Sequence, residues 1–153
     1  MKKLLILLSL GCWAFSLLAT DGKSDNQDNQ LSATVEISQI DLAEKGELIV
    51  RIFYDESSWN DNLPDQEIKI KEFSATHSLS LQLPAKINSL ALQIIHDANQ
   101  NGKMDFRIFP FPKPTEGIGL SNNFFRKGRP RFSDAEISTN DISEQISIEM
   151  NYF

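Results

Sequence analysis

The sequence contains a single cysteine, Cys12, and it lacks an excess of basic side chains. One cysteine allows no disulfide within the chain and no zinc site built from several cysteines. The 153 residues carry 15 basic and 21 acidic side chains, for a formal net charge of −6. Nucleic-acid-binding proteins normally show a net basic footprint. The composition therefore does not support binding to nucleic acid.

The chain also lacks long apolar runs, apart from one at its start. Lys2 and Lys3 precede an apolar stretch over residues 4–19, and polar residues follow from Thr20. This order is typical of a secretory signal peptide, and the run is short for a membrane-spanning helix. We expect residues 1–19 to be cleaved after Ala19 and the protein to be exported to the periplasm or beyond. Cleavage would change the net charge from −6 to −8 and leave no transmembrane segment.

A lipid anchor is the alternative use of this leader. Gly11 precedes Cys12, which has a passing likeness to a bacterial lipoprotein signal. However, Ser9 stands where such a signal has leucine, and the sequence stays apolar after the cysteine. We therefore do not expect lipid attachment through Cys12.

The remainder of the chain has the composition and length of one globular domain. Residues 20–30 contain no large apolar side chain, which predicts a flexible linker. Residues 31–153 form the predicted domain. Apolar residues there recur at every second position, as in half-buried strands, and no window of eleven or more residues has a convincing helical stripe. The predicted strands cover residues 31–37, 48–54, 67–71, 78–83, 90–95 and 146–152, with a possible seventh at 135–137.

Short strands separated by polar turns predict an all-β fold, an antiparallel β-sandwich of about six or seven strands. The immunoglobulin-like and transthyretin-like arrangements are both compatible with this pattern. One segment departs from it, because residues 97–133 show no clear alternation. Loops of that length are uncommon in compact domains unless they are functional or internally anchored. Functional residues are therefore expected in this excursion.

The excursion opens with oxygen donors at every second position. Counting from Asp97, donors stand at positions one, three, five and nine, with Gly102 at position six. This is the front part of a calcium loop, in which glycine allows a sharp turn that brings alternate side chains inward. The predicted Ca²⁺ ligands are Asp97, Asn99, Asn101, the Lys103 carbonyl and Asp105.

The predicted site is structural and weak. Ile108 stands at position twelve, where an EF-hand has its bidentate glutamate, and the preceding segment reads as a strand rather than a helix. Two carboxylates would only neutralise the ion, so a Kd on the order of 10⁻⁴–10⁻³ M is expected. The alternative is a surface turn whose Asn and Asp side chains bond their own backbone.

Three motifs resemble a family of secreted bacterial proteins known as a domain of unknown function. They are the HD-x-N-x-NG-x-x-D loop from His96 to Asp105, the G-x-G-x-SNN motif from Gly117 to Asn123, which we expect to be a turn, and P-x-F-x-DA from Pro130 to Ala135. The resemblance covers about residues 31–153. It implies a β-sandwich protein of the cell envelope and no agreed activity.

Two further features of the excursion are candidates for binding. Residues 126–131 hold four basic side chains, which could grip an anionic polymer, although a loop that balances nearby carboxylates is the simpler interpretation. The apolar residues at 106–112 are expected to form a satellite core that anchors the loop. If these aromatic side chains were exposed, the segment 106–132 would suit a carbohydrate or anionic polymer.

A hydrolase is the remaining alternative. His96, Ser121 and Asp134 could be combined as base, nucleophile and orienting residue, but no nucleophile-elbow pattern accompanies Ser121. We therefore assign no catalytic residue and no organic cofactor. The sequence predicts an exported, non-catalytic module for recognition or scaffolding in the bacterial envelope, with an unidentified partner such as an envelope polymer or protein.

Overall fold

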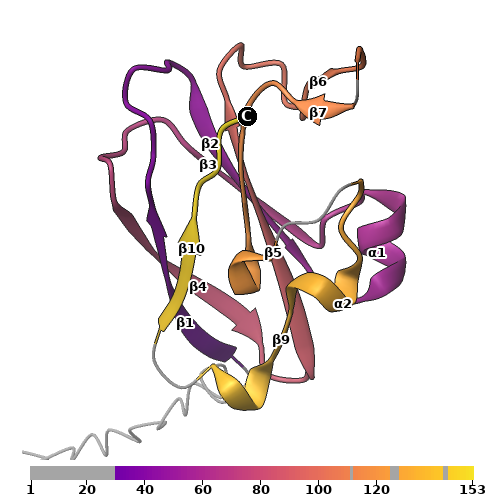
Figure 1. Ribbon diagram of the computed structural model, residues 1–153. Coiled ribbons are helices and arrows are strands. Elements are labelled where there is room, and N and C mark those ends of the chain that lie inside the picture. Colours follow the sequence, from indigo (N-terminus) through magenta and orange to yellow (C-terminus); the bar gives the residue numbers. More distant parts are fainter. Residues whose placement is uncertain (1–29, 111, 125–127, 143–144) are drawn as a thin grey trace, which may run out of the picture.

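The computed structural model describes residues 30–110, 112–124, 128–142 and 145–153 (Figure 1). The predicted signal peptide and residues 20–29 of the predicted linker lie outside these ranges. Gln30, the last predicted linker residue, is instead the first residue of a strand. The secondary structure is mostly β, and the helices are short. Within the described residues no helix is long and apolar enough to cross a membrane.

The predicted strands are confirmed, with small changes at their ends. They are β1 (Gln30–Ser38), β2 (Glu47–Phe53), β3 (Gln66–Ile70), β4 (His77–Pro84), β5 (Ser89–Asp97) and β10 (Gln145–Glu149). The possible seventh strand is β9 (Glu136–Ser138).

The excursion contains more regular structure than the sequence predicts. It holds a small hairpin, β6 (Phe106–Arg107) and β7 (Lys113–Pro114), followed by β8 (Gly117–Leu120). The segment Gly117–Asn123, predicted to be a turn, is therefore β8 followed by the 3₁₀ helix η1 (Ser121–Asn123). The remaining elements are α1 (Glu56–Asp61), α2 (Phe132–Ala135) and η2 (Thr139–Asp141).

The strands form three sheets. One has the order β10-β1-β4, and the second has the order β3-β2-β5-β8 with β9 also pairing with β5. The third is the β6–β7 hairpin. The predicted all-antiparallel arrangement is wrong at one place, because β1 and β10 run parallel. A tight hairpin joins only antiparallel strands, and β10 enters this sheet from β9 of the second sheet rather than by a hairpin from β1, so its direction is not restricted in that way.

A hydrophobic core lies between the two larger sheets. It takes every second residue of β1, β4 and β10 from one sheet and of β2 and β5 from the other, including Val35, Ile37, Leu48, Leu92 and Ile148. Such alternation places one face of each strand inward. All residues of β2 are nonetheless buried, because the outer face of the second sheet is covered as well.

That outer face carries a second core. Phe53, Ala91 and Leu120 pack there against Trp59 of α1 and Phe132 of α2. Figure 1 shows both helices together on this side of the sheet. The indole Nε1 of Trp59 donates to the carbonyl of Pro130 at 2.9 Å, which ties α1 to the segment before α2. The two helices do not cover the part of this face near the end of β5 and the start of β8. The loop that follows Asp97 lies over that part.

Candidate functional site

The predicted ion loop begins where β5 ends. Asp97 is the last residue of β5 and is fully buried, and its register partner across the sheet is Glu47. The alternation of β5 places Asp97 on the outer face of the second sheet, with Gln93 and Ala91. The chain then turns back over this face. A buried strand therefore fixes the first side chain of the loop.

Repeated side-chain-to-backbone hydrogen bonds shape the turn. The Asp97 carboxylate accepts from the backbone N–H of Asn101 at 3.1 Å and of Gly102 at 2.6 Å. Asn99 Oδ1 accepts from Asn101 N at 3.0 Å, and Asn101 Oδ1 accepts from Lys103 N at 2.8 Å. Gly102 has a φ of +75°, the left-handed conformation that favours glycine. The one–three–five spacing thus winds the backbone into a tight turn.

Asp105 closes this turn from the other end. One of its carboxylate oxygens accepts from the side-chain amides of Asn99 at 2.6 Å and of Asn101 at 2.9 Å. The structure therefore brings the side chains of Asp97, Asn99, Asn101 and Asp105 to one loop. Lys103 is the fifth predicted ligand. Within the loop its backbone N–H donates a hydrogen bond to Asn101 Oδ1.

Glu116 also contacts this loop and is not among the residues predicted from the sequence. Its carboxylate reaches into the loop from the residue before β8, accepting from Ala98 N at 3.2 Å and from Asp105 N at 3.1 Å. Glu116 is only 4% exposed. It stands nineteen positions after Asp97, so no loop-spacing rule could identify it. The only sequence signal was an acidic residue directly before the G-x-G strand.

The electrostatic setting of Glu116 is unfavourable for its charge. Burial raises the pKa of the Glu116 carboxyl, and the negative charges of Asp97 and Asp105 raise it further. The two backbone N–H donors oppose this shift only in part. Two buried carboxylates and a third acidic side chain thus surround one small turn.

No salt bridge within the described residues joins a cation to this group, although the charge of Asp97 contributes to raising the pKa of the nearby Lys69. The two salt bridges found there join Arg51 to Glu67 at 3.0 Å and Lys69 to Glu47 at 2.9 Å. Across the same residues, no three carboxylate, histidine or cysteine side chains converge as a ready-made metal cage. Any ion would therefore also need amide and carbonyl oxygens, which the loop supplies.

The structure separates His96 and Ser121, the base and the nucleophile of the hydrolase alternative. His96 is fully buried; its Nδ1 lies 2.9 Å from the Tyr152 hydroxyl, and burial lowers its pKa. Ser121 is also fully buried and bonds Leu92 N at 2.9 Å. Since Leu92 and His96 are four residues apart along β5, Ser121 lies roughly 13 Å from the histidine. The two side chains are not brought together.

The Ser-Asn-Asn segment instead holds strands together. The Ser121 hydroxyl also bonds the Ala135 carbonyl. Asn122 donates to Glu136 O at 2.8 Å, and Asn123 bonds Ser147 O and Glu149 N of β10. In the third motif, Asp134 accepts from Arg131 N at 2.9 Å at the start of α2. These motif residues serve the scaffold.

The aromatic segment differs from its prediction. Phe106, Ile108 and Phe109 are 58%, 79% and 85% exposed, so they do not form a satellite core. A satellite core would need a covering element, and the hairpin extends away from the sheets (Figure 1). In the basic segment, Arg129 Nη2 donates to the carbonyls of Trp59 and Asn60. Phe111, Arg126 and Lys127 lie outside the described residues.

The fold and site define a mostly β protein of several sheets that carries an acidic, asparagine-rich loop at one sheet end. The chain belongs to the family described as uncharacterized proteins conserved in bacteria (DUF2141), which matches residues 35–147. The match includes the loop, Glu116 and the Ser-Asn-Asn segment. Comparisons with curated proteins and with solved structures give no match.

Proposed function

We propose that this protein is an exported, non-catalytic module of the bacterial envelope whose Asp97–Asp105 loop binds a structural Ca²⁺ ion. The observation that carries this proposal is a pair of buried carboxylates, Asp97 and Glu116, that form no salt bridge among the described residues. Buried charges in proteins are normally paired or bound to a metal. A cation at this loop would supply the missing charge.

The donor set favours calcium. The proposed ligands are carboxylate, amide and carbonyl oxygens, which a hard cation prefers, and six to eight of them suit Ca²⁺. Asp97, Asp105 and Glu116 supply the charge, Asn99 and Asn101 supply amide oxygens, and the Lys103 carbonyl completes the proposed set. Glu116 takes the place of the glutamate that the loop lacks at Ile108. A third carboxylate favours tighter binding than two would.

Calcium would also fix the excursion to the sheet. The loop is joined at one end to β5 and, through Glu116, to the start of β8. With a Kd of about 0.1 mM, 1 mM Ca²⁺ would stabilise the fold by roughly 1.4 kcal/mol. For a domain of this size, that is a melting-temperature rise on the order of 5 °C.

Thermal unfolding with 1 mM Ca²⁺, with 1 mM Mg²⁺ and with chelator tests the proposal. We expect Ca²⁺ to raise Tm, and Mg²⁺ to raise it less, because Mg²⁺ demands a stricter octahedral geometry. Calorimetric titration with Ca²⁺ should give one site per chain. An unchanged Tm and no heat at millimolar Ca²⁺ would rule out the ion site.

Glu116→Gln is the diagnostic variant. The amide keeps the size of the side chain and removes a buried charge, but its nitrogen cannot accept one of the two backbone N–H groups that the carboxylate holds. Because the removed charge offsets the lost hydrogen bond, we expect the chelated variant to stay within about 1–2 kcal/mol of wild type. The Tm rise with Ca²⁺ should fall by at least half. Glu72→Gln, at an exposed position outside the loop, is the matched control and should keep the full rise. Asp97 is less suitable, because the two backbone N–H groups that it holds belong to Asn101 and Gly102, and these bonds shape the turn itself.

We assign the two larger sheets to the β-sandwich class, of the immunoglobulin-like or transthyretin-like kind. The support is the common core that both sheets share. Recognition or scaffolding is the role that suits a module whose Ser121 and His96 are buried in separate surroundings. The export step rests on the residue pattern of positions 1–19, and cell fractionation with detection of the mature N-terminus tests it.

A further inference from the structure

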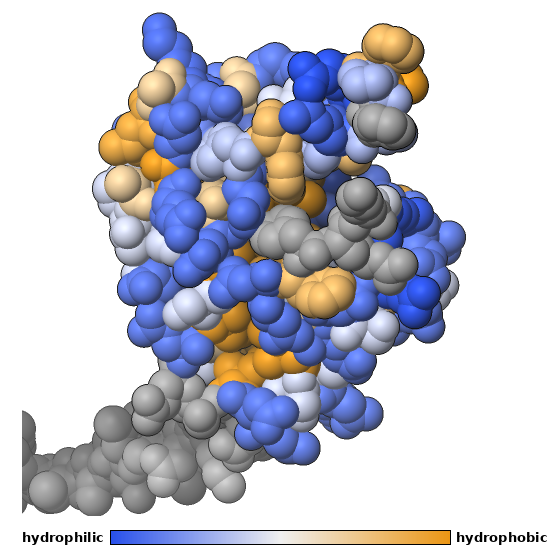
Figure 2. Space-filling view, viewed as in Figure 1, coloured by the Kyte–Doolittle hydropathy of each residue, from blue (hydrophilic) through white to orange (hydrophobic). Residues whose placement is uncertain are grey.

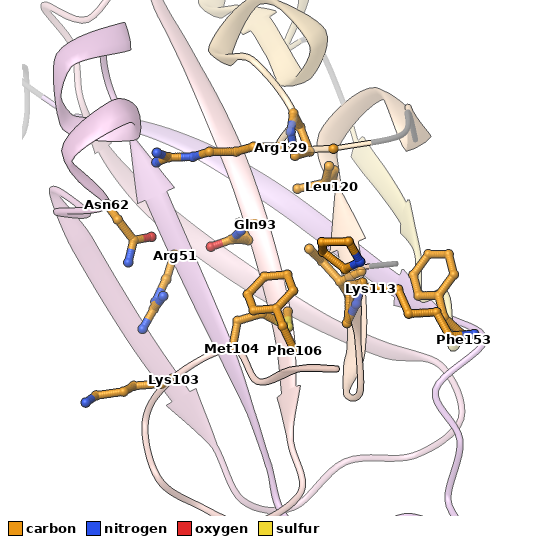
Figure 3. Close-up of a pocket in the computed structure, with 15 residues that line it drawn as sticks. Arg51, Asn62, Gln93, Lys103, Met104, Phe106, Lys113, Leu120, Arg129 and Phe153 are labelled. Carbon is orange, nitrogen blue, oxygen red and sulfur yellow. The ribbon is translucent and has the colours of Figure 1, made fainter. Parts of the chain in front are cut away.

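A cavity of about 1030 Å³ lies beside the ion loop, on the outer face of the second sheet (Figure 3). Its floor is formed by β2, β5 and β8, and its walls by the ion loop, the β6–β7 hairpin and residues 128–130. This volume is at the upper end of the range for small-molecule sites. The cavity is distinct from the proposed ion site, although Lys103 and Met104 of the loop form part of its wall.

The polarity of the floor changes along one row of neighbouring residues. Arg51 pairs in register with Gln93, and Gln93 pairs with Leu120. The row therefore runs from a guanidinium through a carboxamide to an aliphatic side chain. Ile118, the next outward-facing residue of β8, extends the apolar part of the floor. Met104 and Phe106 add apolar side chains to the lining of the cavity. Figure 3 shows Arg51 and Asn62 at one side of the cavity and Phe106, Leu120 and Phe153 toward the other.

The charged lining has one sign. Arg51, Lys103, Lys113 and Arg129 line the cavity, and none of its lining residues is acidic. Glu67 offsets the charge of Arg51 from outside, whereas the other three form no salt bridge within the described residues. On a chain with a net charge of −6 this is a local reversal of sign. It favours an anionic ligand.

Polar groups at this end remain available to a ligand. The Gln93 Oε1 atom is buried and has no hydrogen-bond partner in the described part of the chain. Arg51 uses Nε and Nη2 for Glu67 and Gly102, and Arg129 uses Nη2 for two carbonyls. These contacts fix both guanidinium groups in place, and each guanidinium has five N–H groups in total. The two fixed guanidinium groups attract the charged oxygens of a head group, and the Gln93 oxygen suits a head group that also carries a donor, such as the hydroxyl of a singly protonated phosphate.

From these features we propose that the cavity binds a small amphiphilic anion, with its head group at Arg51, Gln93 and Arg129 and its hydrocarbon body over Ile118 and Leu120. Ile108 and Phe109 are exposed in the same hairpin whose Phe106 and Lys113 line the cavity. Figure 2 shows hydrophobic side chains gathered at the upper right, where Figure 1 places this hairpin. These exposed apolar side chains suit a ligand that is itself partly apolar. The proposal does not rest on ion binding.

Calorimetric titration with twelve-carbon probes below their micelle concentrations tests the site. Dodecanoate carries a carboxylate head group and dodecyl phosphate a phosphate head group, and the probe that binds more tightly identifies the preferred one. Dodecyltrimethylammonium has the same chain with the opposite charge, and inorganic phosphate has the charge without the chain. We expect saturable binding of one anionic probe per chain, with at least tenfold weaker binding of the cationic probe and of phosphate.

Three variants test the placement. Lys113→Glu at the charged rim and Phe106→Ala at the apolar wall should each weaken binding of the anionic probe several-fold. Arg129→Gln should weaken it about tenfold, with circular dichroism checking that the fold is retained. Lys86→Glu makes the same charge change at an exposed position outside the cavity and should leave the affinity unchanged.

Several results would overturn the proposal. Equal affinity for the anionic and cationic probes would indicate nonspecific adsorption of the chain, and equal affinity for phosphate alone would indicate a simple anion site. Binding to anionic phospholipid vesicles without binding of the monomeric probes would indicate a membrane-surface role for the hairpin instead of a cavity ligand. The same titration in chelator keeps the outcome separate from that of the calcium experiment.

Discussion

Two glycines at alternate positions of β8 let the C-terminal segment lie directly against that strand. A Cβ atom on Gly119 would stand 2.8 Å from Ile148 Cγ2 and 3.0 Å from Met150 Sδ. One on Gly117 would stand 2.4 Å from Cε1 of Tyr152. The G-x-G pattern is therefore a packing requirement on the inner face of β8. It leaves the intervening Ile118 to line the cavity on the outer face.

Gly119→Ala should destabilise the fold by about 1–3 kcal/mol, because the added methyl group overpacks a filled site. Chemical denaturation would measure the change. Gly102→Ala is an informative comparison, since space around Gly102 is open but its φ is positive. Its expected cost is about 1 kcal/mol and comes from backbone strain alone. Equal stability of Gly119→Ala and wild type would contradict the close packing of β8 and β10.

At the scale of elements, β10 connects the two larger sheets. It pairs with β1 in one sheet, and beyond its end Asn151 exchanges two backbone hydrogen bonds with Ile118 of β8, at 2.9 and 2.8 Å. Its other edge is covered by a side chain. Asn123 donates to Ser147 O at 3.2 Å and accepts from Glu149 N at 2.8 Å, as a neighbouring strand would. A covered edge is protected from pairing with other chains.

Asn123→Asp should lower stability by about 1–2 kcal/mol and increase self-association. Aspartate tolerates the positive φ of 50° and still accepts from Glu149 N, but it places an oxygen opposite Ser147 O. Denaturant titration and light scattering would measure the two effects. Asn140→Asp, an equal change at an exposed position, is the control. If Asn140→Asp lost as much stability as Asn123→Asp, the effect would come from the added charge and not from the edge of β10.

For the whole molecule, the tyrosines link stability to alkaline pH. Burial raises the pKa of Tyr152, and burial followed by Asp65 raises that of Tyr54. A group whose pKa is raised by folding keeps its proton to a higher pH in the native state than in the unfolded state. The contribution of such a tyrosine to the free energy of unfolding is fully present below pH 10. It is lost as the pH rises through the higher pKa of the folded state.

We therefore expect the free energy of unfolding to fall as pH rises above 10, and to fall less steeply in Tyr152→Phe. Denaturant titrations between pH 8 and 12 would measure the slope. Tyr152→Phe also removes hydrogen bonds to Asp41 N and His96, so its stability at pH 8 should be lower by about 1 kcal/mol. An identical slope in the variant and the wild type would show that Tyr152 does not carry the pH dependence.

The sequence by itself determined the main strands and the acidic turn. Alternating residues such as Val35 and Ile37 predict strands because the period of a strand is local, and Asp97, Asn99 and Asn101 predict a turn because their bonds span few residues. Only the tertiary structure decided which distant groups meet. Glu116 enters the loop, Arg51 and Gln93 share the cavity with Arg129, and β10 runs parallel to β1. These contacts depend on which strands pair and in what register, and this pairing is set by the packing of the whole chain rather than by any local repeat.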